Sequence, residues 1–426
     1  MGLRRRMALV VVTVTATPLV LGGCTVERKP AARPAEREVP SPELTLTPAD
    51  RSRNVPLSAE VAVLVKGGTV TAVRIADDKG MVVRAEPRED GSAWVPTVAL
   101  QPQRTYTAEV IATGDSGGTT TSTTTFTTMP TSTKPQVTST LYFADNRTYG
   151  TAMPVTLAFD PPIAKAARAD VQRRLFVATD PPQPGVWSWV DDGSQVYYRA
   201  PDFWRPGTTI SVRAGLQGLP IGRNRIGDAD RTATSTIGRQ VAIEVDNATK
   251  QMRVLRDGKL IRRIPVSLGK PSTPTSSGRM VIMEKHQRTT FDTRGEPNGG
   301  YVVDVQDAQR LTWGGEFIHG APWSVSDQGR RNVSHGCTNV SAAAADWLMG
   351  VTKVGDLVTF TGTEVRLQPG NGWTAWNTSW EQFVKGSALP VPPGPRPAPT
   401  PVPPHADAVG GESMVGAQAG ASSGTP

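Results

Sequence analysis

The sequence predicts a mainly β protein, in which two tandem immunoglobulin-like β-sandwiches precede a β-rich third domain with one helix. Three observations lead to this fold class. Runs of alternating apolar and polar residues recur along the chain, as expected of half-buried strands. Turns rich in glycine and proline separate these runs, in line with 42 glycines and 37 prolines in the chain. The length of 426 residues predicts several domains rather than one.

The N-terminal end has the pattern of an export signal. Three arginines at positions 4–6 precede an apolar run, 7–21, which is shorter than a membrane-spanning helix requires. This run ends in Leu-Gly-Gly-Cys, which resembles the lipobox of bacterial lipoproteins. We therefore expect residues 1–23 to be a lipoprotein signal peptide and Cys24 to carry the lipid. The alternative is an uncleaved anchor with an incidental cysteine.

Lipidation of Cys24 predicts where the protein works. It would be exported, lipid-anchored to the outer face of the plasma membrane and facing the cell wall. Residues 24–50 are rich in proline and charge and offer little to bury, so we interpret them as a tether of up to about 80 Å. The net charge of +8 comes without a basic run interleaved with aromatic residues. This favours an anionic envelope over nucleic acid as the partner.

Two successive stretches, 51–130 and 131–237, have the short alternating runs and frequent turns of immunoglobulin-like sandwiches. In the first stretch, a threonine-rich run at 119–133 is interpreted as an edge strand that leads into a linker. In the second stretch, we expect the tryptophans to pack in the core rather than to form a platform for sugars. These tryptophans are Trp187, Trp189 and Trp204.

The third domain, 238–366, continues the strand pattern. Asp257 and Gly258 stand between two strand-like runs and predict a tight hairpin. The run 285–301 is interpreted as a long loop that serves as an active-site lid. The residues 341–349 are the most helix-like of the chain, and we expect Ser341 to cap this helix and Gly350 to end it.

The C-terminal part divides in two. Residues 367–389 contain three closely spaced tryptophans, and we expect them to form a small subdomain that packs back on the third domain. Residues 390–426 begin with a dense run of prolines and lack aromatic side chains, so we expect a disordered or extended tail.

A single stretch, 318–341, gathers the residues suited to chemistry. It contains Cys337, the only cysteine left once Cys24 is lipidated, together with His319 and His335. A thiol attacks carbonyl groups as its thiolate, and a histidine can accept the thiol proton. The stretch therefore predicts a cysteine nucleophile with a histidine base, and spacing alone does not decide between the two histidines.

Glycine at 336 favours close approach of the backbone to a substrate. The amides of Gly336 and Cys337 are candidates for an oxyanion hole, which stabilises the tetrahedral intermediate of acyl transfer. A metal site formed by the thiol and the two histidines is the competing interpretation. It lacks a fourth ligand and the ligand spacing of structural zinc sites.

The letters HGAPW followed by SHGCTN resemble the signature of L,D-transpeptidases of the YkuD type. The resemblance covers Arg239 to about Gly362. The lipobox, the two immunoglobulin-like stretches and the tryptophan-bearing C-terminal segment resemble mycobacterial-type members in architecture. The fold implied is a β-rich YkuD-type catalytic domain with a helix after the cysteine. The residues that match the [S/T]HGCxN signature are Ser334, His335, Gly336, Cys337 and Asn339.

The resemblance also implies roles for individual residues. Cys337 would be the nucleophile and His319 the general base, with the ring of His319 oriented by the backbone carbonyl of Gly320, where relatives often have serine. His335 would shape the site rather than act as the base. No metal or other cofactor is implied. The residues implied in oxyanion or substrate binding are Tyr301, Gly314, Gly315, Trp323, Ser334, His335, Gly336 and Asn339.

The implied activity joins two peptidoglycan stem peptides, a donor and an acceptor. A 3→3 cross-link would form through a cysteine thioester, with release of the terminal D-Ala from a tetrapeptide stem, and carbapenem-type inhibitors would acylate the same cysteine. One alternative is an L,D-carboxypeptidase or another cysteine cell-wall hydrolase, although papain-like and NlpC-type hydrolases place the cysteine before the histidine. The other is a non-catalytic envelope-binding lipoprotein.

Overall fold

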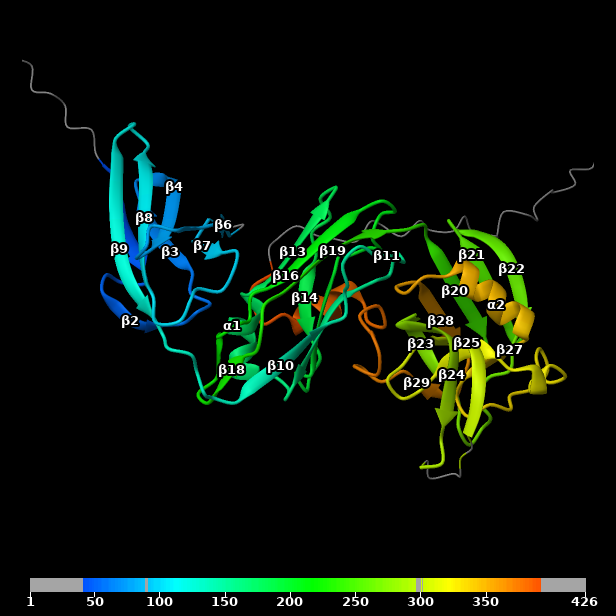
Figure 1. The fold of residues 1–426 in the computed structure, drawn as a ribbon. Coiled ribbons are helices and arrows are strands. Elements are labelled where there is room, and N and C mark those ends of the chain that lie inside the picture. The colour runs from blue at the N-terminus through cyan, green and yellow to red at the C-terminus, as the bar shows by residue number, and fades with distance from the viewer. Residues whose placement is uncertain (1–40, 89–90, 296–299, 301, 392–426) are drawn as a thin grey trace, which may run out of the picture.

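A computed structural model describes residues 41–88, 91–295, 300 and 302–391. Three β-rich units follow one another along an elongated molecule (Figure 1). The predicted signal peptide with Cys24, most of the tether, Tyr301 and the tail beyond Val391 lie outside the described residues. Within the described part, no helix is long and apolar enough to cross a membrane.

The first unit is a sandwich of two sheets with strand orders β1-β3-β7-β6 and β2-β9-β8-β4-β5. Its core lies between the sheets and includes Ile75, Tyr106 and Phe126, each at most 2% exposed. The strands are β1 (Glu43–Thr47), β2 (Ser52–Val55), β3 (Val61–Lys66), β4 (Gly68–Asp77), β5 (Val82–Val83), β6 (Ala85–Pro87), β7 (Ala93–Pro96), β8 (Thr105–Gly114) and β9 (Thr119–Thr128).

Two predictions about this unit were wrong. The tether does not extend to residue 50, because β1 pairs with β3 and alternate residues Leu44 and Leu46 pack against the core. The threonine-rich strand is not at an edge, because β9 lies between β8 and β2. Its alternate residues are buried, and they include Phe126, so an inward apolar face is present among the threonines.

The second unit is also a sandwich, with sheets in the orders β14-β15-β12-β10-β18-β17 and β11-β19-β16-β13. A short helix, α1 (Arg168–Gln172), follows a single 3-10 turn, η1 (Lys165–Ala167). The strands are β10 (Gln136–Leu141), β11 (Thr148–Tyr149), β12 (Val155–Asp160), β13 (Leu175–Asp180), β14 (Val186–Trp189), β15 (Gln195–Arg199), β16 (Thr209–Ala214), β17 (Pro220–Ile221), β18 (Arg225–Gly227) and β19 (Arg231–Ile237).

The tryptophans of this unit pack in the interior, which confirms the prediction. Trp187 and Trp189 are each 6% exposed and Trp204 is 1% exposed. The indole N–H of Trp204 donates to the carbonyl of Met153 at 2.6 Å, so the ring's polar atom is also satisfied. These side chains stabilise the sandwich and present no open platform.

The third unit has two sheets, with the orders β22-β21-β20-β28-β23-β29 and β24-β25-β26-β27. Helix α2 (Ala342–Val351) packs against β25 and β26, and η2 (Pro322–Ser324) follows β26. The strands are β20 (Val241–Asp246), β21 (Gln251–Arg256), β22 (Lys259–Pro265), β23 (Ser276–Val281), β24 (Glu284–Asp292), β25 (Val302–Arg310), β26 (Phe317–Gly320), β27 (Thr338–Val340), β28 (Leu357–Thr361) and β29 (Val365–Arg366).

Local predictions for this unit have mixed outcomes. Asp257 and Gly258 both have positive φ and connect β21 to β22 as a hairpin, as predicted. The Ser341 side chain caps α2 by accepting from the amide of Ala344, also as predicted. The helix does not end at Gly350 but runs to Val351, because the amide of Thr352 still donates to the carbonyl of Leu348.

The predicted lid is mostly a strand. Residues 284–292 form β24, which pairs with β25 in a long antiparallel hairpin. Its letters, EKHQRTTFD, contain a single large apolar side chain, Phe291, so the strand has no apolar alternation by which it could be recognised. The hairpin tip includes residues outside the described part of the chain.

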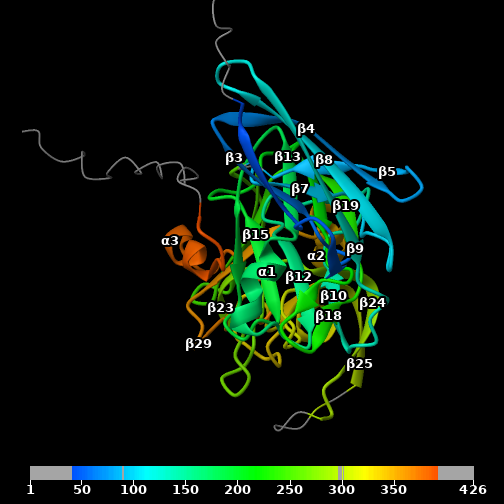
Figure 2. The same cartoon turned by 90° about the vertical axis from the view of Figure 1, so that its left-hand side faces the viewer.

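The C-terminal segment, with α3 (Trp380–Phe383) and η3 (Val384–Gly386), packs mainly on the second sandwich rather than on the third unit alone. The Trp376 ring lies 4.5 Å from Phe203, and its N–H donates to the carbonyl of Ala152 at 2.7 Å. The segment also contacts the third unit, because Asn371 accepts from the amide of Gly314 at 2.8 Å. Figure 2 views the three units end-on, and α3 lies at one side of them.

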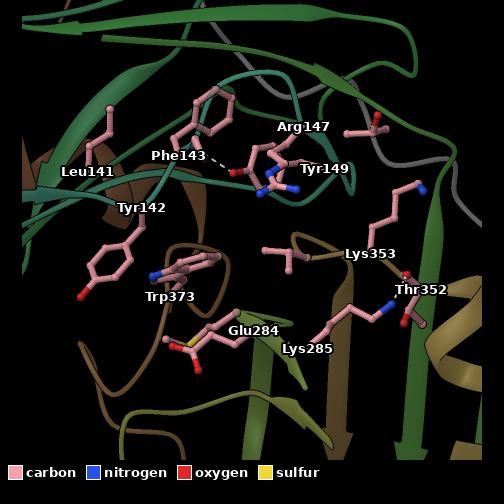
Figure 3. A pocket seen from close by; sticks show the side chains of 14 residues that line it. Leu141, Tyr142, Phe143, Arg147, Tyr149, Glu284, Lys285, Thr352, Lys353 and Trp373 are labelled. Carbon is pink, nitrogen blue, oxygen red and sulfur yellow. Dashed lines mark hydrogen bonds between the residues drawn. The ribbon is translucent and has the colours of Figure 1, made fainter. Parts of the chain in front are cut away.

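A cavity of about 460 Å³ lies at the junction between the second and third units. Figure 3 shows Tyr142, Arg147 and Trp373 around it, with Glu284 and Lys285 from the third unit. None of the predicted site residues lines this cavity. The candidate active site is therefore a separate location.

Candidate active site

Two adjacent parallel strands bring the candidate base and the candidate nucleophile together. β26 pairs with β27 so that Ile318 faces Thr338 and His319 faces Asn339. Side chains alternate between the two faces of a strand, so Phe317 and His319 share one face. Cys337, directly before β27, packs in the same apolar cluster as Phe317.

Aromatic rings enclose this pair. The Phe291 ring lies 4.7 Å from that of Phe317 and meets the ring of His319 edge-on at 5.2 Å. On the outer side, Trp323 is 56% exposed and its ring lies 6.0 Å from that of His319. The base is therefore covered by apolar surface, and Trp323 is accessible at the mouth of the site.

His319 is 3% exposed and has a fixed orientation. Its Nδ1 lies 3.0 Å from the carbonyl oxygen of Gly320. A carbonyl oxygen only accepts, so Nδ1 carries the ring proton and Nε2 is left as the proton acceptor. Burial lowers the pKa of His319, and the bond to Gly320 offsets this only in part. The ring is thus neutral at neutral pH and able to take a proton at Nε2.

Cys337 is buried, with 9% of the residue exposed. Its Sγ lies 3.5 Å from the carbonyl oxygen of Gly315, toward which the S–H can donate. Gly315 has a φ of +92° and Gly336 a φ of +116°, a region that side chains other than glycine rarely adopt. The two glycines therefore set the backbone on either side of the sulfur.

Ser334 organises the turn that leads into the cysteine. It is 6% exposed, and its hydroxyl donates to the carbonyl of Cys337 at 2.5 Å. The same hydroxyl accepts from the amide of Gly336 at 3.2 Å. The Gly336 amide, predicted for the oxyanion hole, already donates within the turn. In this conformation the Gly336 amide therefore does not point to an oxyanion, in contrast to the prediction.

Asn339 holds the loop after β26 rather than facing an open cleft. It is 3% exposed, and its side-chain amide donates to the hydroxyl of Ser324 at 3.0 Å. Ser324 and Gln328 both donate to the carbonyl of Ala321, at 3.2 Å each. This buried network, which sequence reasoning missed, fixes the loop that carries Trp323.

Gly314 and His335 lie at the periphery. The Gly314 amide donates to Asn371 of the C-terminal segment, so the loop before β26 is tied to that segment. His335 is half-buried, and its Nε2 lies 3.2 Å from the Nζ of Lys270. A neighbouring ammonium group disfavours a metal ion there. Among the residues with described positions, no group of three histidine, cysteine or acidic side chains could hold a metal.

Two charged residues beside the cysteine turn were not predicted. Lys270 contacts His335, and the carboxyl of Glu316 accepts from the amide of Ser276 at 2.7 Å. Burial raises the pKa of Glu316, so its carboxyl group resists ionisation. Lys270 belongs to a polar loop that the sequence displays, but no local spacing connects it with a residue 65 positions later.

Comparison with known proteins gives the family. The family described as "L,D-transpeptidase catalytic domain" matches residues 240–360, and "Bacterial Ig domain" matches residues 52–220. L,D-transpeptidase 2 of Mycobacterium tuberculosis (strain CDC 1551 / Oshkosh) is 32% identical over 398 residues, which cover 90% of this chain and 96% of that protein. The chain belongs to the L,D-transpeptidase family.

The likeness of this L,D-transpeptidase to its relatives extends beyond the catalytic domain. L,D-transpeptidase 5 of M. tuberculosis (strain ATCC 25618 / H37Rv) is 33% identical over 399 residues, 91% of this chain and 86% of that protein. A solved structure of an L,D-transpeptidase in complex with imipenem is 32% identical, covers 53% of this chain and 99% of its own, and has a TM-score of 0.45.

These findings confirm three predictions made from the sequence. The family is the one that SHGCTN indicated, the chain is an enzyme of the L,D-transpeptidase type, and the mainly β fold class with immunoglobulin-like and catalytic domains is correct. The non-catalytic alternative does not fit an enzyme of this family. The roles of individual site residues stay predictions.

Proposed function

We propose that this L,D-transpeptidase forms 3→3 cross-links between peptidoglycan stems through a thioester on Cys337. The observation that carries the proposal is the neutral, buried His319, oriented by the carbonyl of Gly320, on the strand beside the cysteine. A neutral imidazole with its Nε2 unprotonated is the form that can accept a thiol proton. No metal or other cofactor enters the proposal.

The first half-reaction transfers the donor stem to the enzyme. The thiol of Cys337 gives its proton to Nε2 of His319, and the sulfur attacks the carbonyl carbon between the third residue and the terminal D-Ala. The tetrahedral intermediate collapses as the carbon–nitrogen bond breaks. His319 returns the proton to the leaving amine, so D-Ala departs neutral at its nitrogen and a thioester remains.

The second half-reaction regenerates the thiol. An amine of the acceptor stem loses a proton to His319 and attacks the thioester carbonyl. The carbon–sulfur bond then breaks and the sulfur takes the proton back. If water took the place of the amine, the product would be a shortened stem, and the enzyme would be an L,D-carboxypeptidase.

Carbapenem-type inhibitors fit the same chemistry, because their strained lactam carbonyl can accept the attacking sulfur without releasing a leaving group. The location is also part of the proposal: a lipid on Cys24 would anchor the enzyme to the outer face of the plasma membrane, within reach of the stems. Replacing Cys24 by alanine should move the protein from the membrane fraction to the soluble fraction. An unchanged membrane fraction would count against the lipid anchor.

Product analysis tests the reaction. Incubating the protein without its signal peptide with a defined tetrapeptide stem should give a dimer linked through the third residues and free D-Ala, both detectable by mass spectrometry. Cys337→Ala should give neither. A tripeptide product without dimer would show a carboxypeptidase instead, and turnover by Cys337→Ala would exclude the thioester mechanism.

A further inference from the structure

A polar loop, 269–275, is fastened to the turn that precedes the nucleophile. The amide of Lys270 donates to the carbonyl of Ser334 at 3.0 Å. The hydroxyl of Thr275 donates to the carbonyl of Gly336 at 2.7 Å. The backbone of Lys270 is therefore held in place relative to the cysteine turn, although it belongs to a loop.

The side chain of Lys270 returns to the same turn. Its Nζ lies 3.2 Å from the Nε2 of His335, and both side chains are half-buried and accessible to solvent. An ammonium group only donates, so the ring nitrogen must accept and His335 is uncharged in this contact. Among the described residues, no carboxylate forms an ion pair with Lys270. A partly buried cation with hydrogen-bond donors to spare is suited to an anionic ligand.

We propose that Lys270 and His335 form a subsite for the free α-carboxylate of the terminal D-residue of the donor stem. This proposal rests on the proposed function and deepens it, because it names the group that would make a tetrapeptide the preferred donor. Lys270 would supply the charge. His335 would hold the ammonium group in position, which agrees with a site-shaping rather than a basic role.

The terminal carboxylate of a tetrapeptide donor stays close to the nucleophile. One extended residue spans about 3.5 Å, so the carboxylate of a tetrapeptide lies about that far beyond the scissile carbonyl. The Cα atoms of His335 and Cys337 are at most about 7 Å apart, since two residues span no more. The ammonium group of Lys270, held by the ring of His335, thus belongs to the same short turn as the nucleophile. The carboxylate of a pentapeptide would lie one residue further away.

A second charged side chain, Glu316, also lies beside this turn. The Cγ of Glu316 lies 3.8 Å from where a β-carbon on Gly336 would stand, and its carboxyl is held by the amide of Ser276. A carboxyl group offers no positive charge to a carboxylate in either protonation state. Of these two side chains, only Lys270 offers a cation to the carboxylate of the leaving residue.

Paired donors test the subsite. We would compare kcat/KM for a tetrapeptide stem with that for the same stem ending in a carboxamide. The wild type should prefer the carboxylate by roughly tenfold or more, since charge-assisted hydrogen bonds are the stronger kind. Lys270→Met should lose most of this preference, because its kcat/KM for the carboxylate donor should fall while that for the carboxamide donor stays. Lys270→Arg should keep part of the preference. An equal fall in kcat/KM for both donors would overturn the proposal, because it would indicate a structural role for Lys270.

A control lysine and a pair of alkylating agents complete the design. Lys259→Met, on the exposed hairpin between β21 and β22, should leave both donors unaffected. Iodoacetate and iodoacetamide alkylate the same thiol and differ in charge. The rate of alkylation of Cys337 by iodoacetate, divided by its rate with iodoacetamide, should fall in Lys270→Met. If the wild type turned over neither donor but this ratio fell, the proposed function would fail and the anion subsite would stand; an unchanged ratio would overturn the subsite.

Discussion

The two junctions between the three units differ in chemistry. The junction between the first and second sandwiches is built from arginines. The guanidinium of Arg88 donates to the carbonyl of Arg173 at 2.8 Å and lies 5.7 Å from the ring of Phe176, and Arg174 lies 3.8 Å from Glu60 of the first sandwich. The apolar core of the first sandwich does not include residues of the second.

The junction between the second sandwich and the catalytic domain is an apolar core shared by both. One cluster joins Val155 and Trp204 of the sandwich to Met283 of the catalytic domain and to Trp376 of the C-terminal segment. The guanidinium of Arg199 lies 4.3 Å from the ring of Trp376, so even the buried cation of this junction is stacked on the C-terminal segment.

Backbone hydrogen bonds strengthen the second junction further. The amide of Gly150 donates to the carbonyl of Val354 at 2.8 Å, and that of Ala152 to Gly355 at 2.9 Å. We infer from this difference that the second sandwich, the catalytic domain and the C-terminal segment form one cooperative unit, here called the larger unit. The first sandwich is attached to it mainly by half-buried polar contacts and, among the described residues, shares no apolar cluster with it.

The largest expected effect comes from Trp376→Ala. Removing a buried ring should lower the free energy of unfolding of the second sandwich and the catalytic domain together by about 3–5 kcal/mol. In calorimetry, the transition of the first sandwich should stay in place. Phe126→Ala, a matched loss from the core of the first sandwich, should shift that transition alone. If Trp376→Ala moved the second sandwich but left the catalytic domain unchanged, the shared unit would be refuted.

A pH effect should also be confined to the larger unit. Asp356 is fully buried beside Gly150, accepts from the amide of Lys353 at 2.7 Å, and burial raises its pKa to about 7. The native state then holds the proton more tightly than the unfolded state, whose carboxyl titrates near 4. Stability should therefore fall as pH rises from about 4 to 7, by a few kcal/mol at most, and level off above that.

Asp356→Asn keeps an acceptor for Lys353 and cannot ionise, so the melting temperature of its larger unit should vary less between pH 5 and 8. The charged neighbours of Asp356 are Lys285 and Lys353, both of which favour its ionised form. The transition of the first sandwich should not respond to the substitution. A wild-type melting temperature that rose through this pH range, with a flat profile in the variant, would contradict the assignment.

The smallest effect is expected at the arginine junction. Arg88→Ala should change neither transition by more than about 1 kcal/mol, because Glu60, which Arg88 pairs with, keeps Arg174 as a second counter-ion at 3.8 Å. It should broaden the distribution of distances between spin labels on the two sandwiches. Arg51→Ala removes an exposed pair with Asp50 of the first sandwich and serves as the control. An unchanged distribution in Arg88→Ala would mean that other contacts fix the sandwiches.

The sequence was informative wherever the signal is local. Apolar alternation located most strands, Asp-Gly predicted the hairpin, and SHGCTN identified the family. The location of the C-terminal segment was not predictable, because Trp376 packs on Ala152 and nothing near either residue encodes the pairing. For the same reason Lys270 was missed: it meets His335 only after the sheet has formed. β24 was missed because its side chains are mostly polar on both faces.

The central claim is that His319, rather than the nearer His335, is the base for Cys337. Stopped-flow measurement of acylation by a carbapenem, with the adduct verified by intact-protein mass spectrometry, tests it most directly. His319→Ala should slow acylation by roughly 100-fold or more, as expected for loss of a general base. His335→Ala should reduce the rate by a much smaller factor. The reverse order of effects would contradict the account and make His335 the base.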